Sequence, residues 1–148
     1  MEELKIGKRK EEKIMKDSIN WKYVKELIDI DSIKKFEEEN KIELPKSLKD
    51  IVVKFNGARP RPNTFDSESS KECVFKSLLS FNTTDKENIF EITKWMKERE
   101  NNIIPFASDP SGNYVCLNEN DQVMLWRHET GKCEFLCNSF DELVDSLY

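Results

Sequence analysis

A complete helix with both of its ends is encoded in the stretch Ile42-Glu43-Leu44-Pro45-Lys46-Ser47-Leu48-Lys49-Asp50-Ile51-Val52-Val53-Lys54-Phe55-Asn56-Gly57. Pro45 suits the first helical position, because its fixed φ is helical and its missing N–H has no partner to lose there. Five apolar residues then recur with the spacing of one helix face: Leu44, Leu48, Ile51, Val52 and Phe55. Asn56-Gly57 supplies a left-handed stop. We therefore predict a buried helix that ends abruptly before the extended, proline-rich residues 58–62.

The rest of the chain predicts further helices around a sheet. Two helices are predicted upstream: one carries Trp21, Val24, Leu27 and Ile28 on one face, and the next starts after Asp31 as N-cap and buries Ile33 and Phe36. Capping boxes predict helices at Thr84-x-x-Glu87 and Ser139-x-x-Glu142. Strands are predicted at residues 72–75, 78–81, 114–117, 122–127 and 134–136. This order favours an α+β fold, a mainly antiparallel sheet covered by helices.

The predicted domain organisation is one domain preceded by an extension. Residues 1–18 are rich in charge, with Lys8-Arg9-Lys10 and few apolar side chains, so we predict a charged helical extension. Residues 19–148 are predicted to form the single α+β domain, which is long enough to bury a core without disulfides or metal.

Several segments, taken in order, resemble the SUKH superfamily, which includes yeast cell-wall assembly regulators and many bacterial immunity proteins. The similar segments are Ile33-Lys34-Lys35-Phe36-Glu37, the I-x-L-P-x-S-L pattern that begins at Ile42, residues 104–109 with 112–117, residues 122–129, and Ser139-Phe140-Asp141-Glu142-Leu143. Their order and spacing carry the resemblance, which runs from about Trp21 to the C-terminus. The resemblance implies a SUKH-like fold and a non-enzymatic immunity protein that binds and neutralises a cognate toxin, a nuclease or another effector acting in the cytosol.

Two other functions stay open at this point. The first is a regulatory scaffold or protein-interaction domain related to the cell-wall assembly regulators. The second is a small ligand-binding domain or enzyme that uses a groove between the sheet and Arg59-Pro60-Arg61.

The composition predicts a soluble, mildly acidic protein, with 36% charged residues and a net charge of −5. The acidic excess argues against direct binding of nucleic acid and would suit an inhibitor of a basic toxin. No apolar run is long enough to span a bilayer, and Met1-Glu2-Glu3-Leu4-Lys5 lacks the apolar core of a signal peptide. We therefore expect a cytoplasmic protein without membrane contact, as a monomer or weak homodimer.

Sequence signals for enzyme chemistry, metal or cofactor are missing. The cysteines lack the paired spacing of zinc sites and are interpreted as small apolar residues: Cys73, Cys116, Cys133 and Cys137. No glycine-rich phosphate-binding pattern occurs, so no nucleotide cofactor is expected. His128 is the single histidine and is interpreted as a solvated turn residue. The run Glu37-Glu38-Glu39 is interpreted as a solvated helix face, because adjacent helix positions do not converge on one point.

What remains is surface recognition. Arg59 and Arg61 flank Pro60 on a stiff extended segment, so they would meet a carboxylate or phosphate at low entropic cost. Packing against the sheet is the alternative for both. Trp126 alternates with Met124 on a predicted strand, so it is either a core residue or an interface anchor. The candidate partner-binding residues are Arg59, Arg61, Ser111, Asn113, Trp126, His128 and Glu129.

Overall fold

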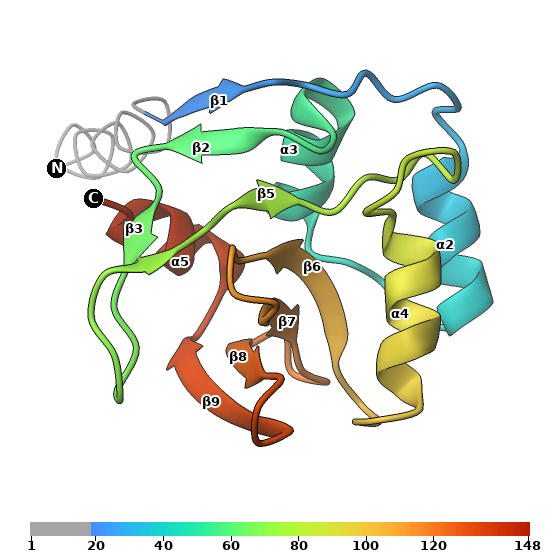
Figure 1. Ribbon diagram of the computed structural model, residues 1–148. Helices are drawn as coiled ribbons and strands as arrows, with labels where there is room; N and C mark the ends of the chain where they lie inside the picture. The colour runs from blue at the N-terminus through green and yellow to red at the C-terminus, as the bar shows by residue number, and fades with distance from the viewer. Residues whose placement is uncertain (1–18) are drawn as a thin grey trace, which may run out of the picture.

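A five-stranded antiparallel sheet forms the centre of the computed structural model, which describes residues 19–148 (Figure 1). Its strands lie in the order of the chain and are β5 Ser77–Leu78, β6 Ile104–Ser108, β7 Tyr114–Leu117, β8 Val123–Arg127 and β9 Lys132–Cys137. Each strand pairs antiparallel with the next. The last three strands form the antiparallel meander that their short connections predicted.

Two short strand pairs flank this sheet. β1 (Asn20–Lys22) pairs antiparallel with β2 (Arg59–Arg61), and β3 (Thr64–Phe65) pairs antiparallel with β4 (Cys73–Val74). The Leu78 N–H in β5 donates to the Ala58 carbonyl, just before β2, at 2.9 Å. Figure 1 shows β2 running beside β5, with β1 outermost. The β1–β2 pair therefore continues the sheet beyond β5.

Helices cover both faces of the sheet. In the described residues they are α2 Ser32–Asn40, α3 Lys46–Phe55, α4 Ile89–Lys97 and α5 Phe140–Ser146. Helices α3 and α5 contact each other and pack over Val115 and Leu125 in the main core. Because side chains alternate along a strand, Cys116 and Trp126 point to the opposite face, where they contact Met96 of α4. The predicted α+β class, with an antiparallel sheet covered by helices, is confirmed.

The helix predicted between Ile42 and Gly57 is confirmed, with a shift of one residue at its start. Pro45 is the N-cap with an extended ψ of 140°, so Lys46 is the first helical residue. Leu48 and Val52 are only 0% and 1% exposed. Gly57 leaves the helix with a φ of +67°, the left-handed conformation that glycine adopts without strain.

The capping predictions have mixed outcomes. At α5 the Ser139 hydroxyl accepts the Glu142 N–H at 3.1 Å, as predicted. The prediction at Thr84 is wrong: α4 starts four residues later, where the Asn88 side chain accepts the Glu91 N–H at 2.9 Å. The reason is that residues 83–87 form turns and bends, and the Ser80 backbone bonds those of Glu87 and Ile89, so helical geometry begins only after Asn88.

Asp31 occupies the predicted N-cap position of α2, but its side chain makes no capping hydrogen bond. Its own N–H instead donates to the Asp29 carboxylate at 2.9 Å. The start of α2 is therefore held by a turn that precedes it.

The helix predicted from Trp21 to Ile28 is wrong. Trp21 is buried as predicted, but within strand β1, and residues 23–30 form an extended irregular segment. Asn56 and Asn82 take the backbone groups that a helix would need, Asn56 through its side-chain amide and its backbone carbonyl. Lys25 exchanges two hydrogen bonds with Asn56, of 2.7 and 2.8 Å, and Asn82 binds the Glu26 carbonyl and the Ile28 N–H, both at 2.9 Å. These tertiary hydrogen bonds therefore outweigh the helical spacing of the apolar residues in this segment.

The early strands are shorter than predicted, only two residues each in β4 and β5, whereas β9 is longer. Phe81 is buried outside the ladder because its N–H donates to Asn56 Oδ1 at 2.8 Å. The charged extension predicted for residues 1–18 lies outside the described residues, so it and the boundary at residue 19 stay predictions. In residues 19–148, no helix is long and apolar enough to cross a membrane.

Candidate partner-binding surface

The β1–β2 pair positions Arg59 and Arg61. Pro60 between them is buried, so the two arginines lie on the other side of β2. Arg59 is exposed and its guanidinium lies 5.9 Å from the centre of the Tyr23 ring, a cation–π contact. Arg61 is half-buried, and its Nη1 donates to the Pro60 carbonyl at 2.8 Å.

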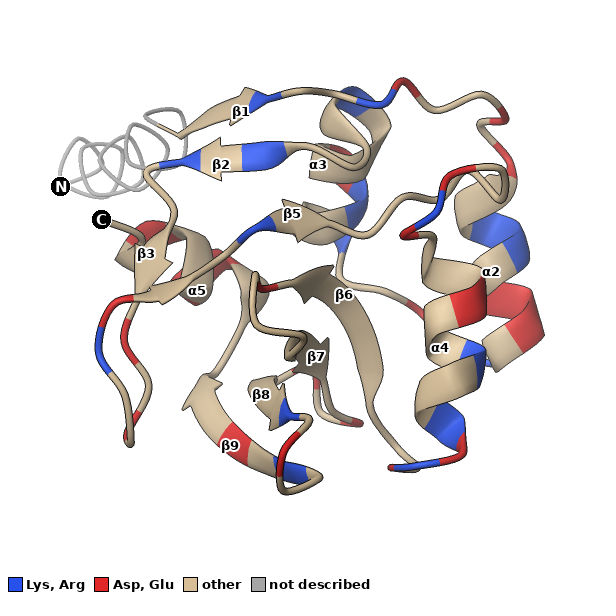
Figure 2. Cartoon of the chain, viewed as in Figure 1, with Lys and Arg blue, Asp and Glu red and all other residues tan. Residues whose placement is uncertain are grey.

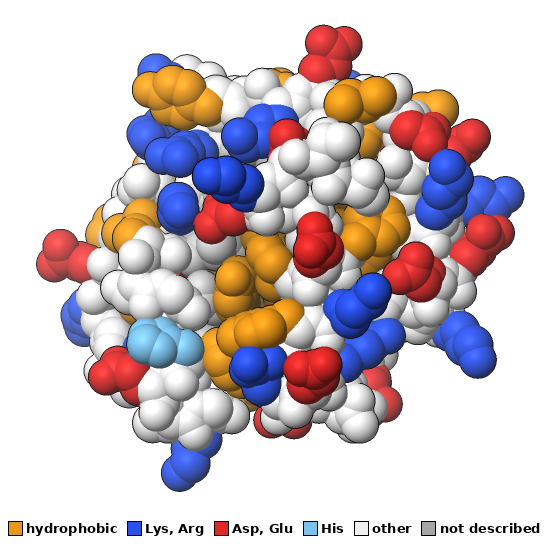
Figure 3. Space-filling model, turned by 45° about the vertical axis from the view of Figure 1, so that its right-hand side comes forward, with side chains coloured by type: hydrophobic (Ala, Val, Ile, Leu, Met, Phe, Trp, Pro, Cys, Tyr) orange, Lys and Arg blue, Asp and Glu red, His pale blue; other side chains and the backbone are white. Residues whose placement is uncertain are grey.

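Two lysines join these arginines. Lys22 is the cross-strand partner of Arg59, and Lys25 packs its stem against Gly57, where a Cβ would lie 3.1 Å from Lys25 Cδ. We call Lys22, Lys25, Arg59 and Arg61 the cationic face. Figure 2 shows this charge on β1 and β2, and Figure 3 shows Lys and Arg side chains gathered over the same strands. Ion pairs between described residues include none of the four.

A cavity of about 700 Å³ adjoins the cationic face and is lined by three of its members, Lys25, Arg59 and Arg61. Asp85 and Glu87 line its other side. Asp85 accepts the Ser80 hydroxyl at 2.6 Å, and Glu87 pairs with Lys76 at 3.4 Å. Because these carboxylates already have partners, the arginines keep their charge available for another molecule.

A second group of predicted residues meets at two turns. The Asp109 carboxylate accepts the backbone N–H groups of Ser111 and Asn113, both at 2.8 Å. Asn113 is buried, and its side-chain oxygen accepts the His128 N–H at 3.0 Å. The His128 ring lies against Gly112, whose missing Cβ would be 3.4 Å from it. Asn113 therefore holds the two turns together, whereas Ser111, His128 and Glu129 are exposed.

Trp126 is a core residue, the first of the two alternatives that the sequence left open. It is 3% exposed and packs with Met96, Ile103 and Cys116. Its Nε1 has no hydrogen-bond partner among the described residues. The neighbouring Trp95 is the partly exposed aromatic on this face. Trp95 packs edge-on against Trp126 with ring centres 5.5 Å apart.

Trp95 was not predicted as a surface residue of interest, because it lies off the buried face that Ile89 and Met96 define. The Arg99 guanidinium covers its ring at 3.8 Å from the ring centre. Tyr114 stands beside both tryptophans, and burial, with the Glu87 carboxylate second, raises the pKa of its phenol. The three rings contact one another and form one aromatic cluster.

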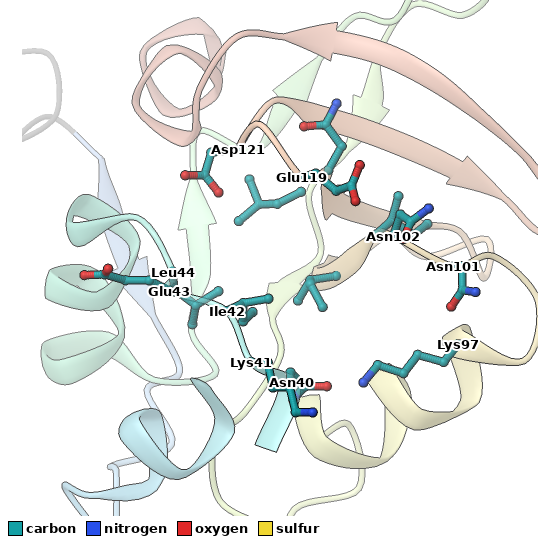
Figure 4. A pocket seen from close by; sticks show the side chains of 14 residues that line it. Asn40, Lys41, Ile42, Glu43, Leu44, Lys97, Asn101, Asn102, Glu119 and Asp121 are labelled. Carbon is teal, nitrogen blue, oxygen red and sulfur yellow. The ribbon is translucent and has the colours of Figure 1, made fainter. Parts of the chain in front are cut away.

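A polar cavity of about 490 Å³ lies where the ends of α2 and α4 meet the β7–β8 turn (Figure 4). Lys97 and Asn40 lie on one side of it, and Glu119 and Asp121 lie on the other. Burial raises the pKa of Asp121, and the Glu43 carboxylate adds to the rise. The lining contains no His, Cys or Ser, so it offers no serine or cysteine nucleophile with a histidine base.

The cysteines behave as structural residues. All four are free thiols. Burial raises the pKa of the Cys137 thiol to about 11 and that of Cys116 well above its usual value. Both stay protonated near neutral pH, and the thiolate is the form that attacks substrates or binds metal. Within residues 19–148, no group of three or more His, Cys, Asp or Glu side chains is placed to hold a metal ion.

The acidic run on α2 is only partly a solvated face, which corrects its interpretation. Glu38 and Glu39 are exposed. The Glu37 carboxylate instead accepts the Leu44 N–H at 2.8 Å and pairs with Lys49 of α3 at 3.0 Å. Glu37 therefore joins two helices and is not available to a partner.

These features define a class: a single α+β domain with an antiparallel sheet, a closed apolar core and candidate recognition groups on its surface. The chain belongs to the SMI1 / KNR4 family (SUKH-1), whose family model matches residues 27–146.

Two proteins are similar to this chain. The SPbeta prophage-derived uncharacterized protein YokK of Bacillus subtilis (strain 168) is 24% identical over 128 residues, which cover 71% of this chain and 67% of that protein. A crystal structure of a protein from Pseudomonas syringae pv. tomato is similar with a TM-score of 0.48 and 21% identity, over 72% of each chain.

Proposed function

We propose that this protein is an immunity protein that binds and neutralises a cognate bacterial toxin, a nuclease or another effector that acts in the cytoplasm. The observation that carries the proposal is the match of the SUKH-1 model to residues 27–146, because the family includes bacterial immunity proteins. Protection would take place in the cytoplasm, by one copy of this protein for each toxin molecule.

The proposed mechanism is occlusion without chemistry. The cysteine thiols with raised pKa values stay protonated, and the His128 ring lies against Gly112 at an exposed turn, away from any cavity described above. Arg59 and Arg61 would provide directed, charged contacts, since guanidinium groups bind carboxylates in a bidentate manner. The exposed Ser111, His128 and Glu129 would form a second contact area. Asn113 and Trp126 would support these areas from below.

The proposal is tested with the toxin whose gene adjoins that of this protein. Co-expression of the two proteins should restore growth, and the purified pair should form a stable complex. Titration separates binding from enzymatic inactivation: toxin activity should fall linearly and reach zero near one equivalent of this protein. Complete protection by a small fraction of an equivalent would indicate catalysis instead. Failure of the wild-type protein to bind or protect against that toxin would contradict the proposed function.

A further inference from the structure

Large apolar side chains are exposed along one short stretch of the chain. The described residues include eight exposed large hydrophobic side chains, and four of them belong to residues 23–30. Their exposed fractions are 68% for Tyr23, 43% for Val24, 77% for Ile28 and 64% for Ile30. We call these four residues the apolar strip. Single exposed hydrophobic residues are ordinary, but a group of them on one segment marks an interaction surface.

The backbone beneath the apolar strip is fixed. Asn56 is 1% exposed and binds four groups at once: Lys25 through two hydrogen bonds, the Ser80 hydroxyl at 3.0 Å and the Phe81 N–H at 2.8 Å. Asn82 binds Glu26 and Ile28 in the same way and is itself held by Asp85 at 3.2 Å. A partner that docks here does not have to order this segment, which lowers the entropic cost of binding.

The apolar strip is continuous with the cationic face. Arg59 lies over the ring of Tyr23, and Lys22 and Lys25 flank that residue in sequence. In Figure 1 the segment leaves β1 and runs along the top of the molecule toward α2, and Figure 3 shows hydrophobic side chains along the same upper border. At the far end the charge reverses, because Asp29 and Asp31 follow Ile28, with Asp29 paired to Lys35 at 2.9 Å.

We propose that the apolar strip and the cationic face together are the surface that binds the toxin, and that the toxin presents an apolar centre bordered by acidic side chains opposite Arg59 and Arg61. This inference rests on the proposed function. It replaces the expectation of a basic toxin, since the four members of the cationic face take part in no ion pair among residues 19–148, although the chain as a whole carries −5. Apolar anchors with arginines beside them have the composition of interface hot spots.

A protein partner fits this surface better than two other occupants. An anionic membrane presents negative charge everywhere and would also meet Glu26, Asp29 and Asp31, whereas a protein can place its acidic side chains opposite Arg59 and Arg61 alone. A second copy of this chain, docked by a two-fold axis through the cationic face, would bring the four like charges against each other.

The test compares four double variants in binding to the purified toxin from the adjacent gene. Ile28→Ala with Ile30→Ala removes the centre of the apolar strip, and Val53→Ala with Phe135→Ala is the matched control on exposed apolar residues elsewhere. Arg59→Gln with Arg61→Gln removes charge, and Lys71→Gln with Lys132→Gln is its control on exposed lysines. All variants change side chains that are exposed or half-buried, and circular dichroism checks that each is folded.

We expect the Ile28/Ile30 variant to bind at least ~30-fold more weakly, mainly through faster dissociation. The Arg59/Arg61 variant should bind ~10-fold more weakly, mainly through slower association, and its affinity should depend less on salt. Both controls should bind as the wild type does.

Three results would overturn this inference while leaving the proposed function intact. The first is full affinity and growth rescue by both surface variants. The second is a wild-type dimer, measured by light scattering, that the Ile28/Ile30 variant loses. The third is binding of the wild type, but not that variant, to phosphatidylglycerol vesicles with unchanged affinity for the toxin. Failure of the wild type to bind the toxin at all is a different outcome, because it contradicts the proposed function itself.

Discussion

Helix α3 and the segment of residues 23–30 carry similar apolar patterns, but they differ in secondary structure and in burial. In α3 the pattern is buried, with Leu48 and Val52 inside the main core. In residues 23–30 the same spacing belongs to an extended chain that leaves Val24 and Ile28 exposed. Apolar periodicity alone therefore does not decide between a buried helix and an exposed strip.

The difference lies in the ends of the two segments and in their hydrogen-bond partners. Helix α3 follows an extended Pro45 and stops at Gly57, so its backbone bonds stay within the helix. Residues 23–30 have no such stop, and Asn56 and Asn82 bind their backbone groups instead. Asn56 is the C-cap of α3 itself. The C-terminal end of α3 thus keeps residues 23–30 in a non-helical conformation.

The largest expected effect contrasts the two apolar patterns directly. Leu48→Ala should lower the free energy of unfolding by about 2–5 kcal/mol, because it leaves a cavity in a fully buried site. Ile28→Ala should change it by less than about 0.5 kcal/mol, because that side chain is mostly in water. Urea unfolding measures both. Similar losses from the two variants would show that residues 23–30 pack against the core in solution.

The next largest loss of stability is expected at Asn56, which links helix α3 to residues 23–30. Asn56→Ala should cost about 2–4 kcal/mol, because it leaves the buried Phe81 N–H and the Lys25 carbonyl without partners. Amide exchange at Phe81 should speed up along with the loss of stability. Asn101→Ala, at an exposed asparagine, is the control and should be neutral. An Asn56→Ala protein with wild-type stability would refute the role of this side chain.

A smaller effect is expected at Gly57, where Lys25 packs against the chain just after α3. Gly57→Ala forces an alanine to a φ of +67° and brings its Cβ to 3.1 Å from Lys25, so we expect a loss of about 1–2 kcal/mol. Gly131→Ala is matched in conformation, with a φ of +71° but no atom within 4 Å of the new Cβ. Thermal unfolding should rank Gly57→Ala as the more harmful. The reverse order would mean that the close approach to Lys25 contributes nothing.

The smallest effect is a local response to acid at the end of residues 23–30. The Lys35 ammonium, with the Asp31 N–H second, lowers the pKa of Asp29. A lowered pKa means that this pair stabilises the fold above the ordinary carboxyl value of about 4 and stops doing so as the pH falls through the folded-state pKa. The amide signal of Asp31 should therefore titrate below pH ~4 in NMR spectra, whereas that of Leu48 should not.

Asp29→Asn is the matching control for this titration, since it keeps the side-chain oxygen that accepts the Asp31 N–H but cannot ionise. Its Asp31 signal should lose the shift that ionisation of Asp29 produces through this hydrogen bond. A titration that persists in the variant would assign the effect to another carboxylate.

Many residues of the candidate surface could be predicted from their residue types, but the way they come together in space could not. The prolines predicted an extended segment around Arg59 but left open whether its side chain packs against the sheet, and the strand of residues 114–117 has the predicted limits. Trp126 could be core or interface by alternation alone, and only its contacts with Met96 and Cys116 place it in the core. The apolar strip was not predicted, because the apolar residues of this segment have the spacing of a helix face.

The sequence by itself determined the local features whose signals lie within a few residues: helix α3 with its glycine stop, the serine cap of α5 and the late antiparallel strands. Those signals act over one helical turn or one strand pair. Tertiary structure decided the rest, because the partners are distant in the chain: Asn56 reaches Lys25 and Phe81, and Arg59 reaches Tyr23. A side-chain amide that satisfies buried backbone groups outweighs periodicity, since an unpaired buried N–H or carbonyl costs more than an exposed isoleucine.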